Sequence, residues 1–166
     1  TDWTKTSAAD LGRAIGKGEV DPVTLTEPFL AAIDGHPSRD DIYSAITPDR
    51  AMAEAEAAKT RAELKQRLSP LDGVPISWKD LFDSAGTETA AGSRLLEGRV
   101  PDTDARVLAN ATKAGLVCLG KTHMSELAFS GLGLNPMTAT PPNVNDAALV
   151  PGGSSSGAAA SVAFGL

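Results

Sequence analysis

The chain has 166 residues, and its 15 Lys and Arg against 21 Asp and Glu give a net charge of −6. With 42% apolar and 22% charged residues, the composition is typical of a globular protein of roughly one domain. The acidic balance argues against a nucleic-acid-binding protein and against a basic surface that binds membranes.

The cysteine content and the hydropathy of the sequence argue against a disulfide-bonded, a metal-stabilised or a membrane-spanning protein. The one cysteine, Cys118, cannot form an internal disulfide, and the sequence has no Cys/His cluster for a structural metal. No apolar run approaches the ~20 residues of a membrane span, and residues 1–5 contain no apolar signal core. We therefore expect a cytoplasmic protein.

A first helix is predicted close to the N-terminus. Ser7, with Asp10 three residues later, forms an acidic variant of the capping box that starts a helix. An apolar stripe follows, and Gly16 and Gly18 are expected to end the helix.

Two further helices are predicted in the first half of the chain. Asp21 and Pro22 form a cap followed by proline at the first helical position. Pro28 lies inside the apolar pattern that follows, so we expect either a kink there or a later start at Thr24. Residues 49–67 are rich in Ala, Glu, Lys and Arg, which predicts a long, mostly solvated helix with a thin apolar stripe.

A strand, a helix and a second strand are predicted after this region. Residues 74–78 read as a short apolar strand, in which Pro75 favours the start of the strand or an edge. Asp104 is expected to cap a helix over residues 105–114, and residues 116–120 read as a buried strand. The expected inward-facing residues of this helix are Val107, Leu108 and Ala111. The alternation suggests a sheet covered by helices.

A long loop over residues 129–157 is rich in Gly and Pro and almost free of charge, and such a loop is usually functional. Its most distinctive part is residues 151–157, Pro-Gly-Gly-Ser-Ser-Ser-Gly. We consider a flexible linker, a phosphate cradle at a helix N-terminus, and a catalytic hydroxyl cluster held by glycine. The helix-like Ala run that follows argues against a linker, and the absence of a P-loop Lys-Ser/Thr pair argues against the cradle.

A catalytic serine needs a base, and the sequence offers few candidates. His36 lies in a turn and is expected to be exposed, while a single histidine such as His123, after a strand, is more often structural than a general base. Lys79 follows an apolar run, and burial would lower its pKa and allow the neutral amine to accept a proton. Asp80 should point to the opposite face of an extended chain. A surface Lys–Asp pair at a strand end is the alternative.

Several segments resemble one family. Residues 71–80, Leu-Asp-Gly-Val-Pro-Ile-Ser-Trp-Lys-Asp, are similar to the strand and catalytic lysine of the amidase signature family. Residues 151–157 with the following Ala run are similar to its serine- and glycine-rich signature. Further stretches match the family pattern in the same order: residues 104–107, 114–122 and 135–143. The similarity runs from about Asp10 to the last residue, so it is more specific than a single Gly/Ser loop.

The resemblance implies a fold class. The fold would be α/β, with a mixed β-sheet core flanked by helices on both faces, the amidase signature fold, and it would be incomplete in this chain. Residues 1–68 would form an N-terminal helical region. Residues 69–166 would form the first part of the core, which would continue beyond the chain end. The resemblance implies no metal and no organic cofactor.

The resemblance also implies a mechanism, in which a Ser–cis-Ser–Lys triad cleaves amide bonds through an acyl-enzyme. Lys79 would be the base and Ser154 the bridging serine, with a cis peptide bond entering Ser154. The nucleophilic serine would lie beyond Leu166, together with the backbone groups of the oxyanion hole. On this interpretation, residues 1–166 alone are inactive.

Other positions match family segments around the substrate. Phe129, Ser130 and Gly131 match the segment that lines the acyl pocket, although core packing is the alternative for Phe129. The supporting residues of the serine loop would be Gly152, Gly153, Ser155 and Ser156. Four residues depart from the usual pattern and put the local loop shape and the substrate preference in doubt: His123, Val144, Asn145 and Leu149.

The predicted function is hydrolysis of a carboxylic amide to an acid and ammonia or an amine. One alternative is the glutaminase-type A subunit of a tRNA-dependent amidotransferase, and another is a non-catalytic truncated fragment or scaffold. The expected partners are a small-molecule amide and the missing C-terminal part of the same protein. A homodimer stays open, and neither nucleic acid nor a membrane is expected.

Overall fold

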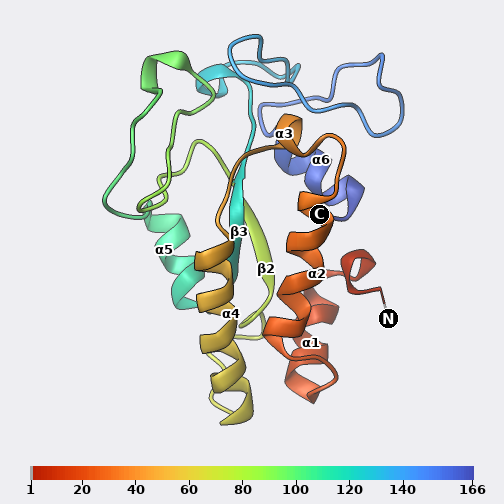
Figure 1. Cartoon of the computed structure of the whole chain (residues 1–166), viewed down its shortest axis with the longest axis vertical. Helices are drawn as coiled ribbons and strands as arrows, with labels where there is room; N and C mark the ends of the chain where they lie inside the picture. Colours follow the sequence, from red (N-terminus) through yellow and green to blue (C-terminus); the bar gives the residue numbers. More distant parts are fainter. Residues whose placement is uncertain (1) are drawn as a thin grey trace.

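The computed structural model describes residues 2–166 and contains a three-stranded mixed sheet surrounded by helices (Figure 1). The strands are β1 (Tyr43–Ile46), β2 (Pro75–Lys79) and β3 (Val117–Thr122), in the spatial order β1–β3–β2. β3 pairs antiparallel with β1 and parallel with β2. The fold class is α/β, as the sequence predicts.

β3 is the central strand, and all of its residues are buried. A strand that is paired on both edges and covered on both faces is mostly apolar, which explains why the pattern of residues 116–120 predicts a buried strand. The last two residues of β3, Lys121 and Thr122, are polar and also buried. β2 lies at an edge of the sheet and begins with Pro75. Because proline has no backbone N–H, this position suits it: no hydrogen bond between the strands is lost. The parallel pair needs a crossover, and this connection contains α5 (Arg106–Lys113).

β1 is a strand that the sequence patterns do not indicate. It follows the short helix α3 (Arg39–Ile42) directly, and it pairs Tyr43 with Thr122 and Ile46 with Gly120. Four residues are too few to show the alternation that marks a strand. Through β1, a segment from the first half of the chain joins the sheet.

The remaining helices are distributed along the chain. They are α1 (Ala8–Lys17), α2 (Pro22–Asp34), α4 (Pro48–Glu63) and α6 (Ser156–Phe164), with 3₁₀ turns at Trp3–Lys5, Arg94–Leu96 and Glu126–Ala128. Across residues 2–166, none of the helices combines the length and apolar character needed to cross a lipid bilayer.

The start and end of α1 agree with the sequence prediction. The Ser7 hydroxyl accepts a hydrogen bond from the N–H of Asp10 at 3.2 Å. Such a cap stabilises a helix by about 1 kcal/mol. Gly18 ends the helix with φ of +73°, a left-handed conformation that glycine adopts without strain.

α2 and α4 differ from the prediction in their ends. α2 begins at Pro22, where the Asp21 carboxylate accepts two N–H groups of the first turn at 3.0 and 3.1 Å, so a later start at Thr24 is wrong. Pro28 lies within the helix. α4 ends at Glu63, before the predicted residue 67. Its apolar stripe consists of small residues, Ala51, Ala55 and Ala58.

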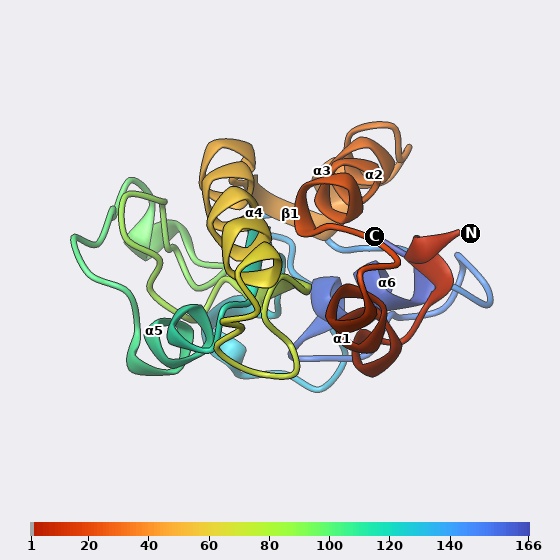
Figure 2. The same cartoon turned by 90° about the horizontal axis from the view of Figure 1, so that it is seen from below.

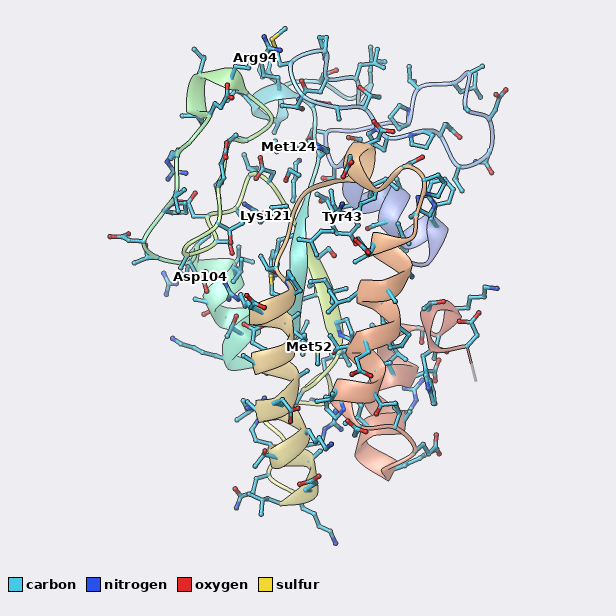
Figure 3. All side chains as sticks on the ribbon, in the orientation of Figure 1. Tyr43, Met52, Arg94, Asp104, Lys121 and Met124 are labelled. Carbon is cyan, nitrogen blue, oxygen red and sulfur yellow. The ribbon has the colours of Figure 1, made fainter. Side chains whose placement is uncertain are left out.

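The predicted cap of α5 is wrong. Ala105 occupies the cap position, and no side chain caps the helix. The Asp104 carboxylate instead accepts two hydrogen bonds from the Arg50 guanidinium, at 3.0 and 2.8 Å, and Figure 3 shows Asp104 beside the start of α4. Val107 is 45% exposed rather than inward-facing, whereas Leu108 is fully buried as predicted.

Alternate residues of β3 belong to two apolar clusters. Val117 and Leu119 belong to the larger cluster, which joins β3 to α1, α2 and α4. Cys118 packs in the smaller cluster with Trp78 of β2 and Leu108 of α5. In Figure 2, α4 and α5 lie on opposite sides of the strands. Helices therefore cover both faces of the sheet, as predicted.

We expect Gly120→Ala to destabilise the protein. A Cβ at Gly120 would lie 2.3 Å from the Ala45 carbonyl oxygen and 3.0 Å from Ile46 Cα, both of which are backbone atoms of the paired strand. Such overpacking costs about 1–3 kcal/mol of unfolding free energy, which urea denaturation would measure. Gly131→Ala is the matched control, because nothing lies within 4 Å of its Cβ position. Equal losses in the two variants would contradict this assignment.

Candidate active site

The carboxyl ends of the parallel strands β2 and β3 meet at one edge of the sheet, and the long loops gather there, in the upper part of Figure 1. In open α/β sheets, ligands bind outside this edge. Lys79 is the last residue of β2 and is paired in register with Thr122, the last residue of β3. The serine loop, residues 151–157, reaches the same edge because α6 packs against both strands.

Lys79 and Ser154 lie together at this edge. The Lys79 Nζ atom is 2.6 Å from the Ser154 Oγ atom, although the two residues are 75 positions apart in the sequence. The peptide bond between Gly153 and Ser154 is cis. Both side chains are half-buried. An amine and a hydroxyl at this distance can exchange a proton directly.

The surroundings of Lys79 favour its neutral form. Burial lowers the pKa of the Lys79 amine below its usual value, because desolvation disfavours the charged ammonium. Among residues 2–166, no carboxylate opposes this shift by its charge. A neutral amine has a lone pair that can accept a proton.

Asp80 points away from Lys79, as predicted for neighbouring residues of an extended chain. Its Oδ1 atom lies 3.0 Å from Lys121 Nζ, which also donates to Thr89 Oγ1 at 2.8 Å. Lys121 is 0% and Asp80 4% exposed. A surface Lys79–Asp80 pair is therefore wrong, because Asp80 forms a buried ion pair with Lys121.

Backbone hydrogen bonds hold the serine loop. Gly153 N–H donates to the Gly131 carbonyl at 2.9 Å, and Gly152 N–H donates to the Leu132 carbonyl at 3.0 Å. The N–H of Ser125 donates to the Ser154 carbonyl at 3.1 Å. The structure thus brings the predicted residues Gly131, Gly152 and Gly153 together beside Ser154.

The two serines after Ser154 lie at the start of α6. Ser155 is the exposed cap residue, and its side chain caps no N–H group. Ser156 is 1% exposed, and its hydroxyl has no hydrogen-bond partner within residues 2–166. The next residue, Gly157, donates its N–H to the His123 carbonyl at 2.9 Å. α6 is therefore joined at its first turn to the end of β3.

The predicted acyl-pocket segment lies on the surface. Phe129 is 95% exposed and is not packed in a core within residues 2–166. Ser130 Oγ accepts a hydrogen bond from the N–H of Leu132 at 3.2 Å and thereby shapes the loop. Gly131 has open space on its Cβ side. An aromatic ring without packing partners in residues 2–166 is available for contact with another molecule or segment.

His123 has a backbone role and also lines a separate hollow. Its N–H donates to the Ile42 carbonyl at 2.8 Å, while its carbonyl accepts from Gly157. Burial lowers the pKa of the imidazole, and the nearby negative charge of Asp80 opposes this shift. The side chain lines a hollow of about 330 Å³, together with Asp80 and Arg94. His36, which was expected to be exposed, is partly buried against Phe164.

Asn135 supports the loops, and the sequence patterns do not single it out. Its Nδ2 atom donates to the carbonyls of Gly92 and Met124, at 2.8 and 2.7 Å. Its Oδ1 atom accepts from the N–H groups of Met137 and Thr138. The available signal is an asparagine before proline within a loop that has almost no charge.

We expect Asp80→Asn to lower the unfolding free energy by about 3–5 kcal/mol, because a buried Lys121 would lose its counterion. Asp83→Asn is the matched control. Asp83 lies 2.7 Å from Arg99, but the two side chains are 33% and 44% exposed, so its loss should cost at most about 1 kcal/mol. Urea denaturation would compare the two, and similar losses would rule out a special role for the buried pair.

The sequence matches a known family model and several curated proteins. A family model described as Amidase matches residues 24–166. The A subunit of the glutamyl-tRNA(Gln) amidotransferase of Anaeromyxobacter dehalogenans (strain 2CP-C) is 40% identical over 94% of this chain and 32% of its own length. The corresponding protein of Thermobifida fusca (strain YX) is 37% identical over 98% of this chain and 33% of its own. The chain spans about a third of the length of these relatives.

Solved structures give the same assignment. One similar structure is an inhibitor-bound vestigial protein complex, described in connection with the evolutionary origins of an s-triazine catabolic enzyme. It is 30% identical in sequence, with a TM-score of 0.90, and the match covers 96% of this chain and 35% of the other chain. The peptide amidase of Stenotrophomonas maltophilia has 34% identity and a TM-score of 0.83, covering 94% and 33%. A fatty acid amide hydrolase at 24% identity and a TM-score of 0.89 shares the fold. With the family match over most of its length, this chain belongs to the amidase signature family of amide hydrolases.

Proposed function

We propose that the complete protein hydrolyses a carboxylic amide to an acid and ammonia or an amine through a serine acyl-enzyme. Lys79 is the base and Ser154 the bridging serine of the triad. The observation that supports this proposal most directly is the 2.6 Å contact between Lys79 Nζ and Ser154 Oγ. The lowered pKa of Lys79, caused by burial, suits a base that must be neutral to act.

The proposed reaction begins with a proton relay. Neutral Lys79 takes the proton of the Ser154 hydroxyl while Ser154 takes the proton of the nucleophilic serine. The serine oxygen attacks the amide carbon, and the relay returns a proton to the departing nitrogen as the C–N bond breaks. Water then attacks the acyl carbon and loses a proton to the same relay. The ester bond to the nucleophilic serine breaks, the relay returns the proton to the serine oxygen, and the acid is released. No metal or organic cofactor takes part in this scheme.

The proposal requires a nucleophile from outside residues 1–166. The chain spans about a third of its curated relatives, and we propose that a C-terminal part of the same protein supplies the nucleophilic serine and the oxyanion hole. An exposed apolar residue of α6, Val162 at 81% exposure, supports a covering segment. In this arrangement, residues 1–68 are the N-terminal helical region and residues 69–166 the first part of the core.

The substrate is proposed to bind beside the serine loop. Phe129, Ser130 and Gly131 are the proposed contacts for the acyl group. Gly131 lies next to the catalytic pair, because its carbonyl accepts the N–H of Gly153. Phe129 is free to contact an apolar acyl group because it makes little contact within residues 2–166.

A second candidate is the glutaminase-type A subunit of a tRNA-dependent amidotransferase. The curated relatives at 40% identity carry that name, which favours this candidate. The two candidates differ in partners, since an amidotransferase component would copurify with other chains and act on glutamine. A stand-alone amidase, as a monomer or homodimer, would cleave simple amides without them. Absence of both activities in the complete protein would leave a non-catalytic scaffold.

We expect Lys79→Arg in the complete protein to reduce kcat/KM by about 10³-fold or more, since arginine does not release its proton near neutral pH. Activity of the unmodified enzyme should fall as the pH drops through the Lys79 pKa, because protonation removes the base. That pKa lies below the usual value of 10.5. Lys113→Arg, at the exposed end of α5, is the matched control. A Lys79→Arg enzyme with most of its turnover would show that another base operates.

We expect residues 1–166 expressed alone to show no amidase activity and to melt without a cooperative transition. The nucleophile would be absent, and α6 would keep residues such as Val162, 81% exposed, without a partner. Thermal unfolding and assays on aliphatic and aromatic amides test this. A cooperative monomeric melt with turnover would contradict it and would make a hydroxyl within residues 154–156 the nucleophile.

A further inference from the structure

The side chain of Asn135 joins the loop after β2, the loop after β3 and its own loop. Its Nδ2 atom donates to the carbonyls of Gly92 and Met124, at 2.8 and 2.7 Å. Its Oδ1 atom accepts from the N–H groups of Met137 and Thr138, at 3.0 and 3.2 Å. A side-chain amide has two protons to donate and two lone pairs to accept with. Asn135 therefore uses its whole hydrogen-bonding capacity on backbone groups.

The polarity of the partners and the burial of Asn135 make this contact specific. Two carbonyls require a donor and two N–H groups require an acceptor, so only one orientation of the amide satisfies all four. Asn135 is 2% exposed, and the two residues whose carbonyls it binds, Gly92 and Met124, are buried as well. Removal of the amide would leave two buried carbonyls without this donor, and such a loss is costly where water has little access.

One of these hydrogen bonds leads directly to Ser154. The carbonyl of Met124, a residue that Figure 3 labels beyond the end of β3, and the N–H of Ser125 belong to one peptide group. Its oxygen accepts from Asn135, and its N–H donates to the Ser154 carbonyl at 3.1 Å. A peptide group is planar and rigid, so a shift of its oxygen also moves its N–H. Asn135 therefore fixes the donor that holds the main chain of Ser154.

The segment that leads into Asn135 holds the other side of the serine loop. Its residues 131–132 accept the N–H groups of residues 152–153, at 2.9 and 3.0 Å. A Cβ at Gly133, two residues before Asn135, would lie 2.1 Å from a carbonyl oxygen of the serine loop, so the two main chains are in close contact. The four hydrogen bonds of Asn135 anchor the end of this segment. Ser154 is thus held from two directions, and both lead back to one side chain.

We infer that Asn135 is a positioning residue for the reaction, whose amide holds the main chain of Ser154 and so keeps the Ser154 hydroxyl 2.6 Å from Lys79 Nζ. Within residues 2–166, Lys79 is the one hydrogen-bond partner of that hydroxyl, so its position depends on the main chain. The inference rests on the proposed function, because it assigns a purpose to the distance between the proposed base and the bridging serine. Asn135 does not touch the reacting atoms.

The test is Asn135→Ser in the complete protein. A serine hydroxyl can still accept from an N–H group two residues later in the chain, so the turn at residues 137–138 is kept. The hydrogen bonds to the carbonyls of Gly92 and Met124 are lost. Misplacement of Ser154 should lower kcat about tenfold. KM should change little, because the relay acts in the transition state and not in substrate binding.

Asn143→Ser is the matched control, because it makes the same change in the same long loop. The Asn143 side chain accepts from the N–H groups of Asn145 and Asp146 and donates to the Val150 carbonyl at 2.9 Å. Within residues 2–166 it binds no peptide group that contacts Ser154, so this variant should keep its kcat. Equal losses of kcat in the two variants would overturn the inference. So would an Asn135→Ser enzyme that loses unfolding free energy but keeps its kcat, because the role of Asn135 would then be structural alone.

Asn135→Asp is a second variant, for the case that the serine variant does not fold. It keeps the size of the side chain and the acceptor for residues 137–138, while the ionised carboxylate has no proton to donate to the two carbonyls. It should show the same fall in kcat at an unchanged KM. A folded Asn135→Asp enzyme with full kcat would overturn the inference.

A measurement without an activity assay separates this inference from the proposed function. Crystal structures of the unmodified and the Asn135→Ser complete protein give the distance between Lys79 Nζ and Ser154 Oγ. A distance beyond hydrogen-bond range in the variant, more than about 3.2 Å, supports the positioning role. A distance that stays within this range overturns it. The proposed function fails separately, if Lys79→Met retains amidase activity.

Discussion

The buried ion pair between Asp80 and Lys121 is the interaction on which the arrangement of the site depends. Both side chains are almost inaccessible to water, and Thr89 and backbone N–H groups complete their hydrogen bonding. Two charges can be buried in this way only when each neutralises the other. Because Asp80 is committed to Lys121, Lys79 is left without a counterion among residues 2–166. Two lysines in neighbouring strands thus differ: Lys121 is held by Asp80 and Thr89, whereas burial lowers the pKa of Lys79.

Around this pair, the site is assembled mainly from backbone rather than from side chains. The two loop segments that flank Ser154 lie so close that a Cβ at Gly133 would be 2.1 Å from the Gly152 carbonyl oxygen. Glycine is required where main chains approach in this way. The hydrogen bonds from Gly152, Gly153 and Ser125 then fix the loop without help from long side chains. Such a site is rigid at the serine, while the neighbouring Phe129 stays exposed.

The caps of α1 and α2 and the buried strand β3 could be predicted from the sequence, because the residues that form each of them lie within a few positions of one another. Asp104 shows the limit of this reasoning. It has the residue type of a cap, but Arg50, 54 positions away, binds its carboxylate. The proximity of Lys79 and Ser154 came from the family resemblance, since no periodicity relates residues 75 positions apart. The strand β1 was missed for a similar reason, since contacts such as the hydrogen bond between Tyr43 and Ser77, 34 positions apart, form only in the folded chain.

Gly157 has a consequence for how this family can diversify. A Cβ there would lie 2.5 Å from the Ile42 carbonyl oxygen and 2.7 Å from backbone atoms of His123. No change in a neighbouring side chain can relieve a collision with main-chain atoms. A substitution of Gly157 is therefore not tolerated and cannot change the substrate preference. An exposed position such as Phe129 can accept a larger or a smaller side chain. Random libraries built on this chain would yield few survivors at the first position and many at the second.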